Sequence, residues 1–251
     1  MPVAVDIIIL SYAKSEQLKN LTIQAVETVL ASENPQEIQF NVLVIESNKT
    51  LQPYQYENTI TIYPTEEFGF NKYLNIGIKR TSSPYICLCN NDLIFHKGWA
   101  TEILNVFNKR KNIDSANPYC TNFKYDERII NGDNVILRNE NLTIDGILTG
   151  WCIFVKRRVF DKIGLLDERF TFWYSDNDYD LTLRKYSIKH ALIKSSVVTH
   201  LACQSHNTLD DKREELTTGQ RLIFEQKWHK PGIRNYLSRI RSALKKPNKQ
   251  Q

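Results

Sequence analysis

A carboxylate and two amides follow a short apolar run near the middle of the chain. Residues 85–89 are mostly apolar, and Asn90, Asn91 and Asp92 come directly after them. Carboxylate oxygen is a ligand that Mn²⁺ and Mg²⁺ prefer, and such a cation can offset the charge of a diphosphate leaving group. The same residues also make a good turn after a strand, so this segment alone leaves a metal site and a turn both open.

A second acidic segment, residues 175–180, carries carboxylates at three alternate positions beside aromatic residues. Asp176, Asp178 and Asp180 repel one another unless a cation or a proton-transfer role holds them together, and a helix N-cap explains only one of them. His200 follows a predicted strand over 192–198, where a neutral imidazole could complete a metal shell with Asp92, although a lone histidine is often structural. Together these segments favour a metal-assisted reaction.

The elements that must position these residues alternate between strand and helix. Apolar runs predict strands over 5–10, 42–45, 59–63, 85–89 and 192–198, and helical spacing predicts helices over 18–29, 71–80, 99–109 and about 180–190. We therefore expect an α/β, Rossmann-like fold with a mostly parallel central sheet and helices on both faces. Glu46 and residues 90–92 then lie at carboxyl ends of strands, where such sheets bind ligands. Residues 121–145 are polar and predict a long surface excursion.

Composition and missing motifs exclude several classes of function. The chain has neither a P-loop nor a Gly-x-Gly-x-x-Gly after its first strand, and its five cysteines include no Cys-x-x-Cys pair. No apolar run approaches the ~20 residues of a membrane span, so we expect a cytoplasmic protein with reduced thiols. Six of its basic residues and no acidic one lie in 234–251, which leaves the rest at −1 and does not indicate a nucleic-acid partner.

Taken in order, these segments resemble the GT-A fold glycosyltransferases of family 2, especially the rhamnosyltransferase-like members. The resemblance spans roughly residues 5–228 and implies a domain over 1–232, with a donor half at about 1–120 and an acceptor half at about 146–232. The matching segments are 68–77, 90–92 with Gly98-Trp99, 150–157, Phe160, Gly164, 167–170, 178–184, His200 and Phe224-x-x-Lys227-Trp228.

The resemblance implies an inverting transfer from a nucleoside-diphosphate-sugar to a hydroxyl of a glycan or lipid-linked glycan. Asp92, with His200, would bind Mn²⁺ or Mg²⁺, and Asp178 would be the general base, although Asn177 stands where the family has Glu. The donor would contact Ser11, Tyr12, Glu46, Lys72, Asn75, Asn90 and Asn91, with the Glu46 carboxylate accepting from the nucleobase. The acceptor would contact Trp151, Trp173, Tyr174 and Asp176.

The basic C-terminal segment allows two interpretations. Residues 233–246 have helical spacing of apolar side chains among Arg and Lys, which suits either an anionic membrane surface or a solvated tail within 233–251.

Two other functions also stay open: a sugar-1-phosphate nucleotidyltransferase, and a non-catalytic carbohydrate-binding protein on the same fold.

Overall fold

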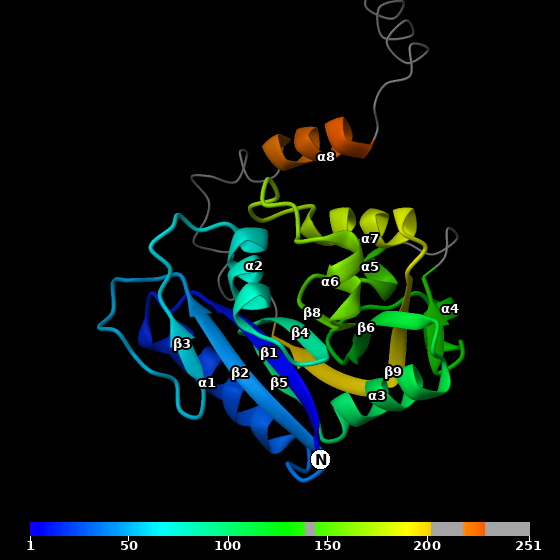
Figure 1. Cartoon of the computed structure of the whole chain (residues 1–251), viewed down its shortest axis with the longest axis horizontal. Helices are drawn as coiled ribbons and strands as arrows, with labels where there is room; N and C mark the ends of the chain where they lie inside the picture. The colour runs from blue at the N-terminus through cyan, green and yellow to red at the C-terminus, as the bar shows by residue number, and fades with distance from the viewer. Residues whose placement is uncertain (139–143, 202–217, 229–251) are drawn as a thin grey trace, which may run out of the picture.

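The computed structural model describes residues 1–138, 144–201 and 218–228, which form a nine-stranded sheet with helices on both faces (Figure 1). The first half of the chain contains β1 (Val3–Ser11), α1 (Glu16–Ala31), β2 (Ile38–Glu46), β3 (Ile60–Ile62), α2 (Phe70–Arg80), β4 (Tyr85–Asn90), β5 (Leu93–Phe95) and α3 (Trp99–Lys109). The second half contains β6 (Ile113–Cys120), α4 (Glu127–Ile130), β7 (Val135–Leu137), α5 (Ile144–Ile147), β8 (Cys152–Lys156), α6 (Arg158–Ile163), α7 (Ser175–Lys185), β9 (Lys189–His200) and α8 (Gln220–Trp228).

The strands follow the order β3-β2-β1-β4-β8-β6-β9-β5, and β7 pairs with β9. The first four are parallel, as are β6 and β9, whereas β4–β8, β6–β8, β5–β9 and β7–β9 are antiparallel. The α/β class and the central sheet are thus as predicted, but the sheet is mixed rather than mostly parallel, because β8 runs against both of its neighbours and β9 pairs antiparallel with β5 and β7.

Two apolar cores lie on opposite faces of the sheet. One packs α1 and α3 against it around Trp99, and the other packs α2, α6 and α7 around Leu88. Gly77 lets α2 approach β1 closely, because a Cβ there would fall 2.5 Å from Cγ2 of Ile8. Helices on both faces are therefore confirmed (Figure 1).

Two segments differ from the sequence prediction. The helix expected at about 180–190 is α7, which begins at Ser175 and ends at Lys185, so His190 lies buried in β9. Carboxylates in its first turn favour the helix N-terminus, and this outweighs the loop-like composition. The polar segment 121–145 is not a bare excursion: within its described residues α4 packs through Ile129, and β7 pairs with β9.

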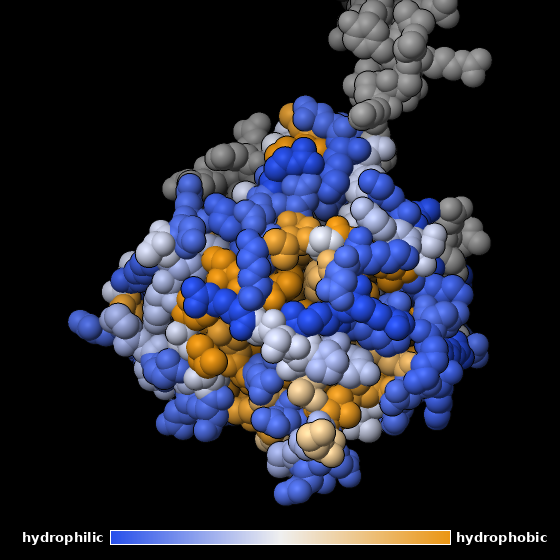
Figure 2. Space-filling view, viewed as in Figure 1, coloured by the Kyte–Doolittle hydropathy of each residue, from blue (hydrophilic) through white to orange (hydrophobic). Residues whose placement is uncertain are grey.

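The last described helix, α8, lies over the loop that precedes α7. The Phe224 ring is 6.4 Å from that of Phe170 and 5.2 Å from that of Tyr174. Figure 2 shows apolar surface gathered around α2 and α6, below α8. This helix lies within the predicted domain 1–232, and the predicted C-terminal helical extension, the basic segment 233–251, lies outside the described residues. No helix in the described part of the chain has the length and apolar character needed to cross a bilayer.

Candidate functional site

Three strand ends meet at one edge of the sheet, as predicted. Ser11, the last residue of β1, is in register with Glu46, the last residue of β2, and Asn90 at the end of β4 is in register with Leu10. Because these strands are parallel, their carboxyl ends and the loops that follow share that edge. The segment 90–92 and Glu46 are therefore neighbours across the sheet.

Asp92 and His200 are distant in sequence and adjacent in space. β5 follows directly after Asp92 and pairs with β9, which places Leu93 in register with His200. The Asp92 Oδ1 lies 3.1 Å from His200 Nε2, with side-chain exposures of 7% and 18%. The backbone N–H of Leu201 donates to the Asp92 carbonyl at 2.9 Å, which fixes the two strand ends together. The predicted pair of metal ligands is thus brought together.

The Asp92 carboxylate lacks the hydrogen bonds that its burial requires. Among the described side chains, Asp92 Oδ1 is the buried polar atom without a hydrogen-bond partner, because the nearby His200 Nε2 is not aligned to donate to it. An unsatisfied buried polar group costs about 1–3 kcal/mol, and more when it is charged. Carboxylate oxygen and imidazole nitrogen are both ligands of divalent cations. The pair therefore fits the cation that the resemblance implies.

Trp151 and Asn90 extend this edge toward β8. The Trp151 indole stacks on the His200 imidazole with ring centroids 5.5 Å apart and planes 21° apart. The Trp151 carbonyl accepts from the backbone N–H of Asn90 at 3.0 Å. The site therefore has an aromatic wall that is bonded to the same segment that carries Asp92.

The three carboxylates of α7 point to three different surroundings. Asp176 lies against Gly150, with 3.5 Å between its Cβ and the position of a Cβ built on that glycine, and its Oδ1 accepts from the Asn177 N–H at 2.9 Å. Asp180 forms an ion pair with Arg138 at 3.1 Å. Because Gly150 precedes Trp151, Asp176 is the one of the three that contacts the segment bordering Asp92 and His200.

Asp178 faces α8 instead. Its side chain is buried, with Lys227 Nζ 2.7 Å from Oδ1 and Trp228 Nε1 donating to Oδ1 at 2.7 Å. Lys227 also bonds Asp167 at 2.8 Å. Burial raises the pKa of Asp178, against the opposing effect of Lys227 and Trp228, while the Arg169 guanidinium and Lys227 hold the pKa of Asp167 below its ordinary value. The carboxylate predicted to face an acceptor is thus bonded to helix α8.

Glu46 organises the protein's own loops. Its Oε1 accepts from the backbone N–H groups of Ala13 at 3.0 Å and Asn48 at 2.7 Å, and its Oε2 accepts from the Tyr56 hydroxyl at 3.1 Å. With 2% of its surface exposed, it has little room for the nucleobase contact that the sequence predicted. Its carboxylate instead fixes the backbone after β1, where Tyr12 lies.

A chain of hydroxyl groups, which sequence reasoning missed, joins this loop to the segment 90–92. Ser11 Oγ lies 2.8 Å from Thr22 Oγ1 and 3.3 Å from the Tyr56 hydroxyl, and Asn91 Nδ2 donates to Thr22 Oγ1 at 2.9 Å. We call Asn91, Thr22, Ser11 and Tyr56 the hydroxyl relay. The predicted donor contacts Ser11 and Asn91 are therefore bonded internally. Thr22 could have been found from the sequence as a polar residue on the apolar face of α1.

Two predicted donor contacts on α2 have different surroundings. Lys72 is partly exposed near the start of the helix, and its Nζ donates to the Glu67 carbonyl at 3.3 Å. Asn75 is buried and its amide bonds Leu166 and Glu168, so it connects α2 to the segment after α6 rather than facing a donor. Of these two residues, Lys72 is therefore the one available to an anionic ligand.

The predicted acceptor aromatics lie on the loop before α7. Trp173 is 40% exposed and meets Phe172 edge-on at 5.5 Å, while Tyr174 has a positive φ of 62° and packs on Phe224. This loop is bonded to the start of α2, where the Phe70 N–H donates to the Thr171 carbonyl at 2.8 Å. One exposed aromatic ring is thus offered beside the α2 N-terminus.

Comparison with known proteins places this geometry in context. A structure of Staphylococcus aureus TarS, residues 1–349, is similar with a TM-score of 0.58 and 13% identity, covering 79% of this chain and 59% of that one. Drosophila β1,4-galactosyltransferase 7 in complex with xylobiose gives 0.53 and 11%, covering 82% and 73%. GalNAc-T7 with UDP, GalNAc and Mn²⁺ gives 0.58 and 11%, covering 78% and 43%. At such low identity these likenesses concern the fold, which is that of GT-A glycosyltransferases.

The sequence also matches a family model, over fewer residues than the structural similarities cover but with a more specific result. The chain spans 59% of the S. aureus structure, and no functionally curated protein matches it significantly. The model for glycosyl transferase family 2 matches residues 7–164, which include most of β1, the segment 90–92 and β8. These residues cover more than half of the chain and include Asp92 and Trp151, while His200 and the carboxylates of α7 lie beyond them. The chain belongs to glycosyl transferase family 2.

Proposed function

We propose that this protein is an inverting glycosyltransferase that moves a hexosyl or deoxyhexosyl group from a nucleoside-diphosphate-sugar to a hydroxyl of a glycan or lipid-linked glycan. The observation that carries the proposal is the buried Asp92 oxygen that has no hydrogen-bond partner among the described residues, beside His200 at the ligand-binding edge of the sheet. Family membership supports sugar transfer. The rhamnosyltransferase-like subgroup stays a prediction.

Asp92 and His200 would hold Mn²⁺ or Mg²⁺. The GalNAc-T7 structure contains UDP and Mn²⁺, which supports a nucleoside diphosphate and a divalent cation here. When bound, such a cation offsets the negative charge that develops on the departing diphosphate. Lys72 is the cationic side chain that would approach the phosphates from α2, and Asn90 and Tyr12 would contact the nucleoside. In this proposal Glu46 shapes the nucleoside site by fixing the loop after β1.

The base is better assigned to Asp176 than to Asp178. A general base must reach the acceptor hydroxyl, and Asp176 is partly exposed on Gly150, whereas Asp178 is buried against Lys227 and Trp228. The Asp176 carboxylate would take the hydroxyl proton while the acceptor oxygen bonds to the anomeric carbon. The bond from that carbon to the diphosphate oxygen breaks on the opposite face, so the configuration inverts.

The acceptor would enter between Trp151 and the loop before α7. Trp151 lies next to Gly150 in sequence, and aromatic faces suit the C–H surfaces of sugars. Trp173 is the exposed ring of the loop and would contact a more distant part of the acceptor, with Tyr174 anchoring the loop on α8. A cytoplasmic location and membrane contact through 233–246 stay predictions from the sequence.

A matched pair of variants tests both the reaction and the base. The full chain is incubated with nucleotide-sugars, Mn²⁺ and a glycan acceptor, and release of nucleoside diphosphate is measured. We expect Asp176→Asn to lower kcat at saturating donor by about 100-fold or more while the melting temperature stays unchanged. Asp178→Asn should keep kcat within a few-fold of wild type and change the melting temperature instead.

The opposite ranking of the two variants would return the base to Asp178. Pyrophosphate release from a nucleoside triphosphate and a sugar phosphate would instead identify a nucleotidyltransferase. Glycan binding without any metal-dependent turnover of a donor would identify a carbohydrate-binding protein on this fold.

A further inference from the structure

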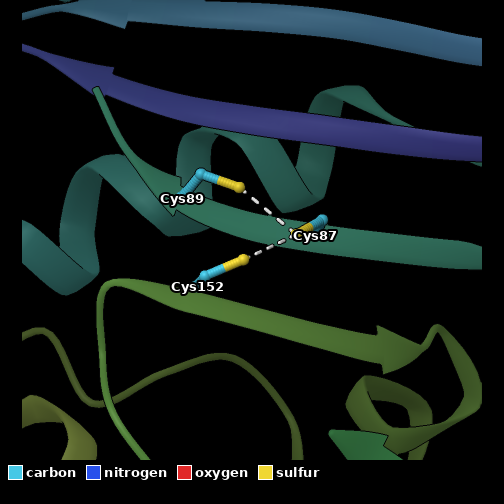
Figure 3. Close-up of side chains that lie close together, drawn as sticks. All are labelled: Cys87, Cys89 and Cys152. Carbon is cyan, nitrogen blue, oxygen red and sulfur yellow. Dashed lines mark hydrogen bonds between the residues drawn. The ribbon is translucent and has the colours of Figure 1, made fainter. Parts of the chain in front are cut away.

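Three thiol groups converge in the core beneath the candidate site. Cys87 and Cys89 lie on the same face of β4, since alternate residues of a strand share a face, and Cys152 is the partner of Cys89 across β8. The Cys87 Sγ is 3.2 Å from that of Cys89 and 3.7 Å from that of Cys152 (Figure 3). All three ligand atoms lie within 4.8 Å of one another, and the side chains are at most 2% exposed.

The spacing of the sulfurs matches a single shared ion. With a metal–sulfur distance of about 2.3 Å, three thiolates around one ion in a trigonal arrangement are roughly 4 Å apart. The observed separations approach this value without any change of strand position. Thiolates select soft, thiophilic ions over the hard cations suited to Asp92. The three sulfurs therefore favour a soft ion, unlike the hard cation proposed for Asp92 and His200.

We propose that Cys87, Cys89 and Cys152 form a three-thiolate site for a soft trivalent ion of the arsenic(III) type. Arsenous acid reacts with three thiols to give one As(S)₃ group and three waters. Three As–O bonds break and three As–S bonds form. Each thiol proton leaves with a departing hydroxide, and no atom changes oxidation state.

Charge is the reason for choosing a trivalent ion. The sulfurs are surrounded by an apolar core that includes Trp99 and Phe154, and an uncompensated buried charge is costly. Three thiolates leave a net charge of −2 with a monovalent ion and −1 with a divalent one, but they neutralise a trivalent ion.

The test uses the full chain, reduced with a phosphine, in a Cys203→Ser background that removes the thiol outside the described residues. Arsenite is added, and the bound arsenic is counted by native mass spectrometry. We expect one arsenic per chain, a near-ultraviolet sulfur-to-arsenic absorption band and a rise of several degrees in melting temperature, because the ion binds the folded state. Cys87→Ser, Cys89→Ser and Cys152→Ser should each lose the bound arsenic.

Cys120→Ser is the matched control, because Cys120 is buried in the same core but outside the trio, and it should keep the bound arsenic. The melting temperature of the Cys203→Ser chain, with all three core cysteines present, decides the question even where a further variant fails to fold. An unchanged or lowered value with arsenite would overturn the proposal, since an ion that binds only the unfolded chain lowers it. A larger rise with Zn²⁺ at equal concentration would overturn the charge argument. No result depends on transferase activity, so the proposed function is tested separately.

Discussion

Two buried carboxylates of this protein, Asp92 and Asp178, have opposite surroundings. Asp92 lies at the sheet edge beside His200, and its Oδ1 has no hydrogen-bond partner among the described residues. Asp178 lies between α7 and α8 and is bonded by both Lys227 and Trp228. Both carboxylates lie in segments that the sequence analysis singled out as candidates for catalysis or metal binding.

The difference teaches where to look for function. A carboxylate whose bonds are all supplied by the protein has its burial explained by structure, whereas one left unsatisfied requires something from outside the chain. By this criterion we expect the ligand site around Asp92. The region around Asp178 is a joint that attaches α8.

The largest effect should come from Asp92→Asn. If this carboxylate holds the cation, the substitution should lower kcat/KM by about 100-fold or more and weaken Mn²⁺ dependence, with no loss of stability because no protein hydrogen bond to Oδ1 is removed. Activity across a Mn²⁺ titration, together with denaturant unfolding, measures both. His200→Ala should act in the same direction, and the double variant should fall little further. If Asp92→Asn kept the Mn²⁺ dependence of the wild type, Asp92 would not hold the cation. The contrast between Asp92 and Asp178 would then not identify a ligand site.

The second-largest effect should be a loss of stability caused by Lys227→Met. It leaves Asp167 and Asp178 without their shared cation, so we expect the free energy of unfolding at neutral pH to fall by about 2 kcal/mol. Lys227 is 24% exposed at its side chain, which keeps the loss below that of a fully buried pair. Urea unfolding measures it, and Lys185→Met on α7 is a control for loss of one surface charge. An unchanged urea midpoint in Lys227→Met would contradict the proposal that Lys227 attaches α8 through Asp167 and Asp178.

The pH dependence of that loss follows from Asp178. Its folded pKa is raised above the ordinary value of 3.8 by burial, so its contribution to stability is largest in acid and declines as pH rises through the folded pKa. Removal of Lys227 raises that pKa further. The stability difference between wild type and Lys227→Met should therefore be widest near neutral pH and should narrow as the pH falls through the raised pKa of Asp178.

The smallest effect should come from Thr22→Val in the hydroxyl relay. The change keeps the shape of the side chain but leaves the buried Asn91 amide without its acceptor, at a cost of about 1 kcal/mol. Because Asn91 lies next to Asp92, we also expect the donor KM to rise a few-fold while kcat changes less. Steady-state kinetics check this, and Thr22→Ser, which retains the hydroxyl, should restore the wild-type KM. A KM unchanged in Thr22→Val would mean that the relay is only structural.

Much of the donor half could be predicted from the sequence. The apolar runs at 5–10, 42–45 and 85–89 lie within β1, β2 and β4, because a strand covered on both faces must be apolar throughout. The meeting of Asp92 with His200 was also predicted, from their places at strand ends. What the sequence could not supply was the internal bonding of Glu46, Asn75 and Asn91, since these amides and carboxylates are as suitable for the protein's own backbone as for a ligand.

The acceptor half was harder because the backbone state of residues 175–180 was not known. Three carboxylates at alternate positions were predicted to act together around a cation or in proton transfer, with a helix expected only from about residue 180. In a helix, alternate positions are rotated by about 200°, so Asp176 faces Gly150 and Asp178 faces α8, while Asp180 pairs with Arg138. The start of α7 thus decides which carboxylate can act as a base.

The short pairing of β5 with β9 also makes the candidate metal site a property of strand alignment. Side chains alternate between the two faces of a strand, so a shift of one residue along β9 would bring Thr199 opposite Leu93 and turn the imidazole of His200 to the other side. Thr199 resists such a slip, since its hydroxyl lies 2.9 Å from His96 Nε2 and 2.7 Å from that of Thr121. The bonds of Thr199 to His96 and Thr121, none of them proposed cation ligands, can therefore decide whether Asp92 and His200 meet.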